Sequence, residues 1–252
     1  MLCLCVSMSN SLDPTITHYL SENNLPFKDF FQFGLSVDCV IFGYQQKSLK
    51  VLLIQRGAEP FQSKWAIPGD LVNPGEDLDA SANRILKHLT GLENIFVEQF
   101  HTFGKTDRHP AGRVVTVGYF SLVRSENYQP VASNWASDIG WFDVEDLPDL
   151  AFDHSQIMDA AINALRKKVK TEPIGFNLLP PKFTLLELQG LYEAVLRQKF
   201  DKPNFRKKIL GTGILIPLDE VQQNVAHRPA KLFRFDLERY HSLGREPFSF
   251  EL

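Results

Sequence analysis

Cysteine is scarce in this chain, and the long apolar runs of membrane proteins are missing. Only Cys3, Cys5 and Cys39 occur in 252 residues, which is too few for a disulfide framework, and the short spacing of Cys3 and Cys5 does not suit a metal site. No apolar run is long enough to span a bilayer, and the N-terminal stretch lacks the basic segment of a signal peptide. These absences predict a cytoplasmic protein with no metal or cofactor site. Met8 is an alternative start, which would remove Cys3 and Cys5.

A large excess of charge of one sign is also missing. The formal net charge is −3, so the molecule as a whole provides no strong field for a nucleic acid. The charge is nevertheless uneven along the chain, because from residue 177 onward 12 Lys and Arg stand against 9 Asp and Glu. An acidic front and a mildly basic tail indicate an asymmetry between the two parts of the chain.

Residues 30–170 have the pattern of a domain that mixes strands and helices. Apolar residues at helical spacing predict helices over 77–90 and 154–170. Runs rich in β-branched and apolar residues predict strands before and between these helices, at 33–44, 49–55, 95–104, 113–124 and 139–143. This part of the chain is therefore long enough and apolar enough to form a domain with its own core.

Three prolines and a glycine in residues 171–182 predict an extended linker. In the next unit, residues 183–252, Thr184 and Glu187 have the spacing of a capping box that begins a helix. A short basic helix and two strands follow, over 204–210, 213–217 and 231–236. A helix, a turn, a basic helix and two strands is the element order of a winged helix-turn-helix.

The segment from Trp65 to Leu92 resembles the signature motif of Nudix domains, in which a glycine-bearing loop precedes a helix rich in glutamate. Glu76 matches the loop glutamate, Arg84 matches the helix arginine, and Gly91 closes the segment. The resemblance implies a Nudix-like αβα sandwich with a mixed sheet, so the predicted fold is α+β, with the winged helix-turn-helix after it. An accidental match of a loop and a helix is the alternative.

The metal-binding part of the Nudix motif is missing. Ile85, His88 and Leu89 stand where the family has glutamates, and Asp70 replaces the loop glycine. Residues three and four apart share a helix face, so the family pattern directs carboxylates at one Mg²⁺ ion, which prefers oxygen ligands. Because the aliphatic side chains supply no oxygen, we expect no hydrolase activity and no catalytic residue. Catalysis by relocated carboxylates is a weaker alternative.

Basic residues mark candidate DNA contacts in the C-terminal unit. The start of a recognition helix meets base edges in the major groove, while neighbouring Lys and Arg contact phosphates. Basic side chains of a wing reach the backbone or the minor groove. The candidates in the short helix and at the wing are Asn204, Arg206, Lys207, Lys208, His227, Arg228 and Lys231. An ordinary solvated helix face is the alternative.

The two motifs together resemble the Nudix-related transcriptional regulators of bacteria, and among them the arabinose-responsive regulators of Bacteroidetes. The likeness covers nearly the whole chain after residue 30, including SVDCVIFG at 36–43, DRHPAGRVVTVGY at 107–119 and NFRKKI at 204–209. It implies a homodimer that binds operator DNA and senses a small-molecule effector with its Nudix-like domain. That effector would be a pentose such as L-arabinose, which implies a role in carbohydrate metabolism. Sensing of ADP-ribose or another NAD metabolite, hydrolysis of nucleoside diphosphate derivatives, and a pure protein-interaction module are the alternatives.

Six residues flank the cleft that the resemblance implies, and we predict that they bind the effector: Arg56, Trp65, Glu76, Asp107, Arg108 and Arg113. Arginines suit a diphosphate, whereas carboxylates and an aromatic face suit a sugar. Asp107 and Arg108 begin a motif that ends in Arg-Gly-Trp in the ADP-ribose branch of the regulators. Here the motif ends in Ala-Gly-Arg113, which counts against an NAD-derived ligand. Each residue also has a structural alternative, such as core packing for Trp65.

Overall fold

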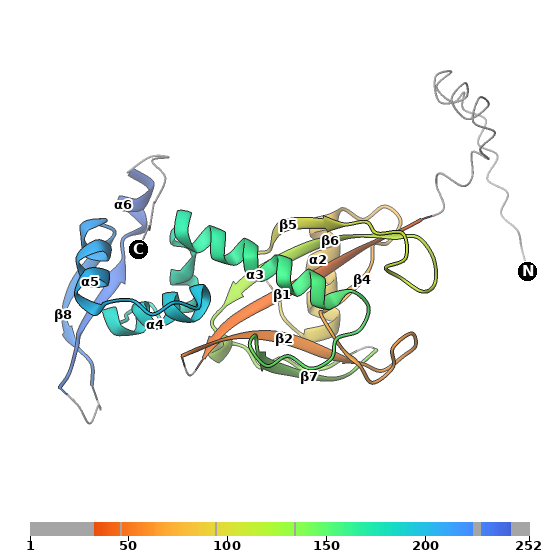
Figure 1. The fold of residues 1–252 in the computed structure, drawn as a ribbon, viewed down its shortest axis with the longest axis horizontal. Helices are drawn as coiled ribbons and strands as arrows, with labels where there is room; N and C mark the ends of the chain where they lie inside the picture. The colour runs from red at the N-terminus through yellow and green to blue at the C-terminus, as the bar shows by residue number, and fades with distance from the viewer. Residues whose placement is uncertain (1–32, 46, 94, 134, 224–227, 243–252) are drawn as a thin grey trace, which may run out of the picture.

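The computed structural model describes residues 33–45, 47–93, 95–133, 135–223 and 228–242. Figure 1 shows a large mixed sheet with a helix on each face, followed by a smaller C-terminal group of helices with a two-stranded sheet. This arrangement confirms the predicted α+β class. Within the described residues, no helix is both long and apolar enough to cross a bilayer.

The large sheet is built around β1 (Gly34–Gln45), which forms an antiparallel hairpin with β2 (Ser48–Arg56) and pairs in parallel with β6 (Val114–Val123). The order along the sheet is β3-β2-β1-β6-β5, while β4 pairs with β1 and β7 pairs with β2. The other elements of this unit are β3 (Trp65–Ala66), β4 (Gly69–Leu71), β5 (Glu98–Phe103), β7 (Ala136–Asp143) and the 3-10 turn η2 (Ser125–Asn127). A central parallel pair of strands requires apolar cover on both faces.

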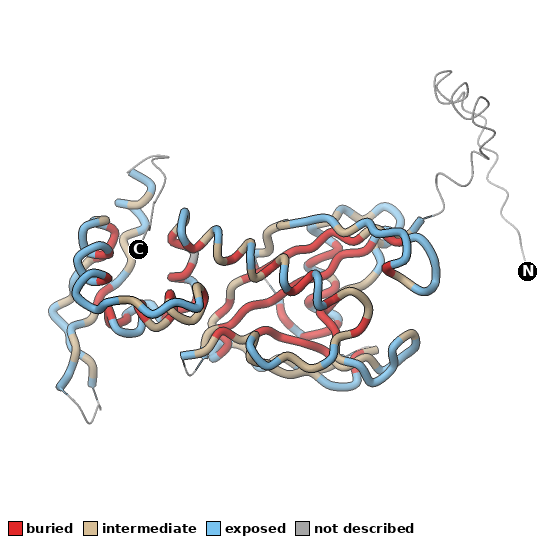
Figure 2. The backbone as a smooth tube through the Cα atoms, viewed as in Figure 1, coloured by how far each residue is buried: buried red, intermediate tan, exposed pale blue. Residues whose placement is uncertain are grey.

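Two helices provide that cover. Helix α2 (Leu78–Thr90) lies on one face of the sheet and α3 (His154–Thr171) on the other. Alternate side chains of β1 divide between the faces, so that Val37 packs with α2, whereas Val40 and Phe42 pack with α3. Figure 2 shows the central strands buried along most of their length. On its face of the sheet, α3 contacts β5 and β6.

The C-terminal unit has the predicted order of a winged helix-turn-helix. Its elements are α4 (Leu185–Leu196), α5 (Lys202–Gly211), β8 (Leu215–Val221), β9 (Lys231–Phe235) and α6 (Leu237–Ser242). Helix α6 was not predicted from the sequence. The capping box is confirmed, because Thr184 Oγ1 accepts from the Glu187 N–H at 3.1 Å and Glu187 Oε2 accepts from the Thr184 N–H at 2.7 Å. Such a cap stabilises a helix start by about 1 kcal/mol.

The segment between the two units is not an extended linker. Pro173–Leu178 forms a 3-10 helix, η3, and the side chains of Phe176 and Leu178 are buried. The prediction of an extended conformation over 171–182 is wrong here. The apolar side chains between the prolines pack into a hydrophobic core to which both units contribute. One hydrophobic cluster runs from β2 and α3 through η3 into α4 and α5. The two units therefore share part of their core.

Candidate functional site

Arg56, at the end of β2, lies over two aromatic rings. Its guanidinium carbon is 4.9 Å from the ring centroid of Trp135 and 4.9 Å from that of Phe152. Its Nε donates a hydrogen bond to the Pro60 carbonyl at 2.7 Å. Burial lowers the pKa of Arg56 below its ordinary value, but an arginine remains cationic at neutral pH. The rings therefore orient a permanent positive charge beside an aromatic surface.

Arg108 forms a buried ion pair with the residue that precedes α3. Its Nε and Nη2 donate to the two carboxylate oxygens of Asp153 at 2.9 and 2.7 Å, a two-point geometry. A second carboxylate, that of Asp38 on β1, lies 3.8 Å from the same Nη2. The side chains of Arg108, Asp153 and Asp38 are only 4 %, 10 % and 8 % exposed. One cation thus serves two buried carboxylates.

That imbalance changes the titration of Asp38. Burial raises the pKa of Asp38 from 3.8 to about 7, with Arg108 opposing the shift and Asp153 adding to it. The folded protein therefore holds a proton between these two pH values that the unfolded chain has released. By linkage, the free energy of unfolding falls as the pH rises through that window.

We expect Asp38→Asn to remove this pH dependence. The amide has no proton to lose, so the variant should gain stability relative to the natural chain as the pH rises from 3.8 to about 7. The gain should reach a few kcal/mol, at about 1.4 kcal/mol for each pKa unit. Urea unfolding at several pH values measures it, with the exposed Asp107→Asn as the control. If the free energy of unfolding of Asp38→Asn and of the natural chain changed equally with pH, Asp38 would not be the group that titrates in this range.

His154, the first residue of α3, is a neutral member of the same cluster. The Ile67 N–H donates to its Nδ1 at 2.9 Å, so Nδ1 is the acceptor and Nε2 carries the hydrogen. Nε2 lies 3.9 Å from Asp38 Oδ1. Burial, with the positive charges of Arg108 and Arg56 acting in the same direction, lowers the pKa of His154 from 6.5 to about 3. His154 therefore contributes a fixed dipole, and no proton exchange is expected from it near neutral pH.

The Nudix-like loop is pinned to helix α2. Arg84 donates from Nε to Glu76 Oε1 at 2.7 Å, and it also lies 3.7 Å from Asp70, the residue in the position of the box glycine. Glu76 Oε2 further accepts from the Ser81 hydroxyl at 2.6 Å. These bonds, with the one to Arg84 dominant, lower the pKa of Glu76 to about 2. Glu76 therefore holds the loop against the helix.

The helix face that would carry metal-binding glutamates is part of the core. Ile85 and Leu89 are each 1 % exposed and belong to the cluster between α2 and the sheet, while His88 is exposed on the outer side. Among the residues that the structure describes, no group of three or more His, Cys, Asp and Glu side chains is arranged to hold a metal ion. In this unit the positions of two of the metal-binding glutamates are thus occupied by aliphatic side chains that pack against the sheet.

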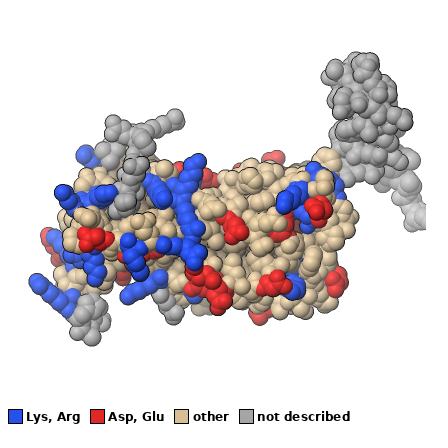
Figure 3. Space-filling view, in the orientation of Figure 1, with Lys and Arg blue, Asp and Glu red and all other residues tan. Residues whose placement is uncertain are grey.

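Basic side chains gather over the C-terminal unit and its border with the first unit, as the visible face in Figure 3 shows. Helix α5 begins after Asp201, whose carboxylate accepts from the Asn204 N–H at 3.1 Å. Asn204, Arg206, Lys207 and Lys208 are exposed along this helix, whereas Phe205 and Ile209 anchor it in the core. The exposed side of α5 therefore carries the basic side chains of Arg206, Lys207 and Lys208, and DNA contact by these residues stays a prediction.

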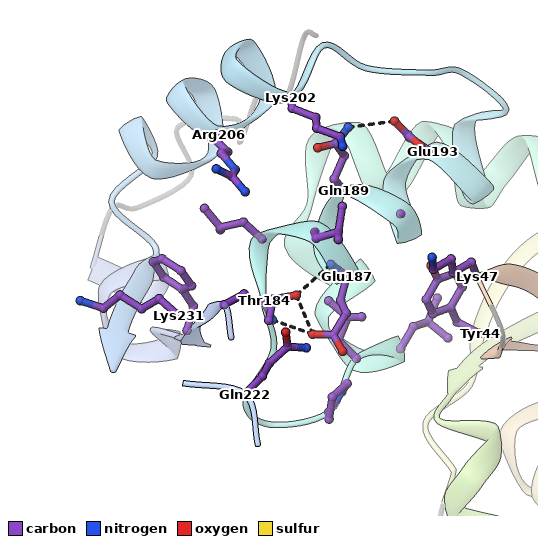
Figure 4. A pocket seen from close by; sticks show the side chains of 18 of the residues that line it. Tyr44, Lys47, Thr184, Glu187, Gln189, Glu193, Lys202, Arg206, Gln222 and Lys231 are labelled. Carbon is purple, nitrogen blue, oxygen red and sulfur yellow. Dashed lines mark hydrogen bonds between the residues drawn. The ribbon is translucent and has the colours of Figure 1, made fainter. Parts of the chain in front are cut away.

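A hollow of about 1220 Å³ opens between the two units. Helix α4, the first turns of α5, the wing and the β1–β2 hairpin all contribute to its lining. Figure 4 shows Arg206 from α5 and Lys231 from the wing on one side of the hollow and Lys47 from the hairpin on the other. Arg228 also lines it. His227, the remaining predicted DNA contact, lies outside the described residues.

Comparison with known proteins assigns both units. Residues 32–161 match the NUDIX domain family, and residues 175–235 match the NrtR DNA-binding winged helix domain. The chain is 36% identical over 210 residues to a protein of Acinetobacter baylyi described as an ADPR responsive transcriptional repressor NtrR, covering 82% of this chain and 83% of that one. The chain belongs to the NrtR family. NrtR of Shewanella oneidensis, in its crystal structure complexed with a 27mer DNA, is 32% identical with a TM-score of 0.70, covering 80% of this chain and 93% of that chain.

Membership of the NrtR family confirms the coarser part of the functional prediction, a DNA-binding transcriptional regulator that contains a Nudix domain. The NUDIX domain of Shewanella oneidensis NrtR, crystallised with ADP ribose, is 35% identical with a TM-score of 0.50, covering 59% of this chain and 97% of that one. These comparisons support the ADP-ribose alternative better than the pentose. They give no support to a closest relationship with the arabinose-responsive regulators.

The six ligand residues predicted in this NrtR-family chain do not all come together. Arg56 and Arg108 belong to one cluster with Asp38, whereas Trp65 packs edge-on against Phe142 at 4.6 Å between ring centroids. Asp107 and Arg113 are exposed in the loop before β6, where Arg113 donates to the Gly104 carbonyl at 2.7 Å. Glu76 is bound to Arg84 as described. Ligand binding by all six stays a prediction, and Arg56, held over two aromatic rings, has the geometry that suits it best.

The sequence analysis missed three groups of this cluster, namely Asp38, Asp153 and His154. One signal was present for Asp38, because it is the only charged residue in the strand-like run 33–44. A carboxylate inside a buried strand is costly unless it is paired, so such a residue indicates a partner from elsewhere in the chain. Asp153 and His154 directly precede or begin a helix, a position that alone does not separate a cap from a site.

Proposed function

We propose that this NrtR-family regulator binds an ADP-ribose-type effector in its Nudix domain without hydrolysing it. The observation that carries the proposal is the contrast within that domain. Arg56 is held over two aromatic rings. In contrast, Ile85 and Leu89 are buried core residues at positions where Nudix enzymes carry metal-binding glutamates. The domain thus keeps groups that recognise a ligand and lacks those that would activate water.

An ADP-ribose-type effector suits the charge of this cluster better than a pentose does. A diphosphate is anionic and pairs with guanidinium groups, whereas a nucleobase or ribose packs on aromatic rings. A neutral pentose would leave the Arg56 cation without an anionic partner from the ligand. The ADP-ribose named for two relatives supports the same choice. Arg113, which departs from the motif of the ADP-ribose branch, lies exposed in the neighbouring loop and supplies a further cation.

Helix α3 provides a physical route from the effector to the DNA-binding unit. Its first residues, next to Asp153, belong to the Arg108 cluster. Near its other end Arg166 Nε donates to the Val195 carbonyl of α4 at 3.0 Å. An α-helix of 18 residues is about 27 Å long, and Figure 1 shows α3 running from the sheet to the C-terminal unit. An anion that draws Arg108 from Asp153 would release the start of this helix.

In a homodimer on operator DNA, a shift of α3 would change the separation of the two winged helices. Each effector-bound state must differ from the free state in its affinity for DNA, since a ligand that binds both states equally regulates nothing. The proposal therefore needs three linked properties: effector binding, DNA binding and an effect of one on the other. Each of them can be measured separately.

We expect ADP-ribose to raise the melting temperature of the purified chain, because a ligand that binds only the folded state stabilises it by about 2.7 kcal/mol at 100 times its Kd. Arg56→Gln should weaken this binding at least about tenfold, since one charge-assisted contact contributes about 1.5–3 kcal/mol. A thermal-shift titration with ADP-ribose, NAD, L-arabinose and D-xylose measures both effects. Fluorescence anisotropy of a labelled operator duplex with and without the effector then tests the switch.

Three outcomes would change the proposal. A shift with a pentose alone would replace the effector class by a sugar. Release of AMP and ribose phosphate from ADP-ribose in the presence of Mg²⁺ would show that the domain hydrolyses its ligand, despite Ile85 and Leu89. Equal weakening by Arg56→Gln and by Lys64→Gln, a control lysine exposed on the neighbouring loop and paired with Asp149, would mean that general charge and no specific contact binds the effector.

A further inference from the structure

We infer that the β1–β2 hairpin of the Nudix domain is itself a DNA-contacting element, with Lys47 placed against the phosphate backbone of the duplex that the winged helix holds. The inference extends the DNA interface from the winged-helix unit to the effector-binding unit. It rests on the proposed binding of DNA by α5 and the wing. The partner is the duplex backbone, a regular array of negative charge at about one per 1.7 Å of helix axis.

The β1–β2 hairpin and the winged helix line the same hollow of the surface. The hollow between the units, about 1220 Å³ in volume, is lined on one side by Arg206 of α5 and Lys231 of the wing. Tyr44, Gln45 and Lys47 of the hairpin line the opposite side of the same hollow, as Figure 4 shows for the labelled residues. A duplex engaged by the recognition helix and the wing would lie over this hollow, with the hairpin at its edge.

A second feature of this surface is its charge. Three acidic and six basic residues line the hollow, the basic ones being Lys47, Lys199, Lys202, Arg206, Arg228 and Lys231. Two of the acidic residues are engaged within the protein. Glu187 accepts from the backbone and the hydroxyl of Thr184 at 2.7 and 2.8 Å, and Glu193 accepts from the Phe200 N–H at 3.0 Å and forms an ion pair with Lys199 at 3.0 Å, so these two charges offset each other. The lining therefore presents an excess of positive charge, which matches a polyanion.

The hairpin lies close to α4 of the helix-turn-helix. A Cβ atom added to Gly190, on α4, would lie 3.0 Å from the Tyr44 hydroxyl, so the hairpin and α4 approach closely at this point. Arg197 after α4 also forms an ion pair with Glu145, which follows β7. Tyr44 of the hairpin also packs against the hydrophobic cluster that includes Leu188 and Leu191 of α4, so we expect Lys47 to keep its position relative to Arg206 when the duplex binds.

We expect Lys47→Gln to lower the salt dependence of DNA binding by one phosphate contact. The slope of log K against log salt should decrease in magnitude by about 0.9, so the affinity deficit of the variant should grow about threefold when salt is lowered from about 200 to 50 mM. Anisotropy of a labelled mixed-sequence duplex of about 30 base pairs measures the slope without knowledge of the operator, because the electrostatic part of binding is independent of sequence. Lys47→Arg should restore the natural slope.

The matched control is Lys87→Gln, which makes the same charge change at an exposed lysine on α2. Lys87 is not among the residues that line the hollow. Arg206→Gln serves as the positive control and should reduce the slope. An unchanged slope for Lys47→Gln beside a reduced slope for Arg206→Gln would overturn the hairpin inference and leave the DNA-binding function intact. Equal changes for Lys47→Gln and Lys87→Gln would also overturn it. Failure of the natural chain to bind any duplex would instead refute the proposed function.

Discussion

Replacement of Arg108 by alanine is expected to lower the free energy of unfolding by about 3–5 kcal/mol, the cost of leaving a buried charge without its partner. The guanidinium is 4 % exposed and holds Asp153 at 2.7 Å, with Asp38 at 3.8 Å. Without it, two carboxylates remain whose side chains are only 8 % and 10 % exposed. Urea unfolding above the Asp38 pKa of about 7 measures the loss at a pH where Asp38 is ionised in the natural chain.

The loss should shrink as the pH falls. The Arg108 charge opposes the raised pKa of Asp38, so removing it raises that pKa further, and protonation of Asp38 then removes an unpaired charge. Arg113→Ala is the control in the same loop, because Arg113 is exposed and donates only to the Gly104 carbonyl among its described contacts; it should change stability by at most about 0.5 kcal/mol. A loss below about 1 kcal/mol for Arg108→Ala at every pH would mean that the cluster tolerates its removal by opening to water.

Features that depend on local spacing could be predicted from the sequence. Ile85 and Leu89 repeat at helical distance from Leu78 and Ala82, and all four contribute to the α2 face that packs on the sheet. The capping box of Thr184 and Glu187 needs only a separation of three residues. For the same reason the absence of metal-binding carboxylates was evident from the motif, since the family pattern confines them to one turn of a helix.

The buried cluster around Arg108 depends on residues that no spacing rule connects. Asp38, Arg56, Arg108 and Asp153 come from two strands, a loop and a helix start, and only the mixed sheet topology brings them together. The linker failed as a prediction for a related reason. Prolines indicate an extended chain when only the local sequence is considered, whereas the burial of Phe176 depends on a core formed by elements far along the chain.

The shared core leads to the second large prediction, which concerns Phe176. Its ring stacks on Phe235 at 4.5 Å between centroids and lies 5.5 Å from Phe183, and the residue is 8 % exposed. Phe176→Ala should cost about 3–5 kcal/mol through lost burial and the cavity left behind. Because one cluster continues from here to β2 and α3, we expect both units to lose stability together.

The three tryptophans, Trp65, Trp135 and Trp141, all lie in the Nudix unit, so tryptophan fluorescence reports the unfolding of that unit alone. Far-ultraviolet circular dichroism reports the helices of both units. With a shared core, Phe176→Ala lowers both denaturation midpoints by the same amount, although the substitution lies outside the sheet. Phe96→Ala, at a side chain that is 80 % exposed, should shift neither midpoint by more than a surface change does, about 0.5 kcal/mol. The contrary result is a fluorescence midpoint that stays at its natural value while the dichroism midpoint falls, which would show that the winged helix unfolds independently of the Nudix unit. A movement of α3 could then not be transmitted to the winged helix through a shared core.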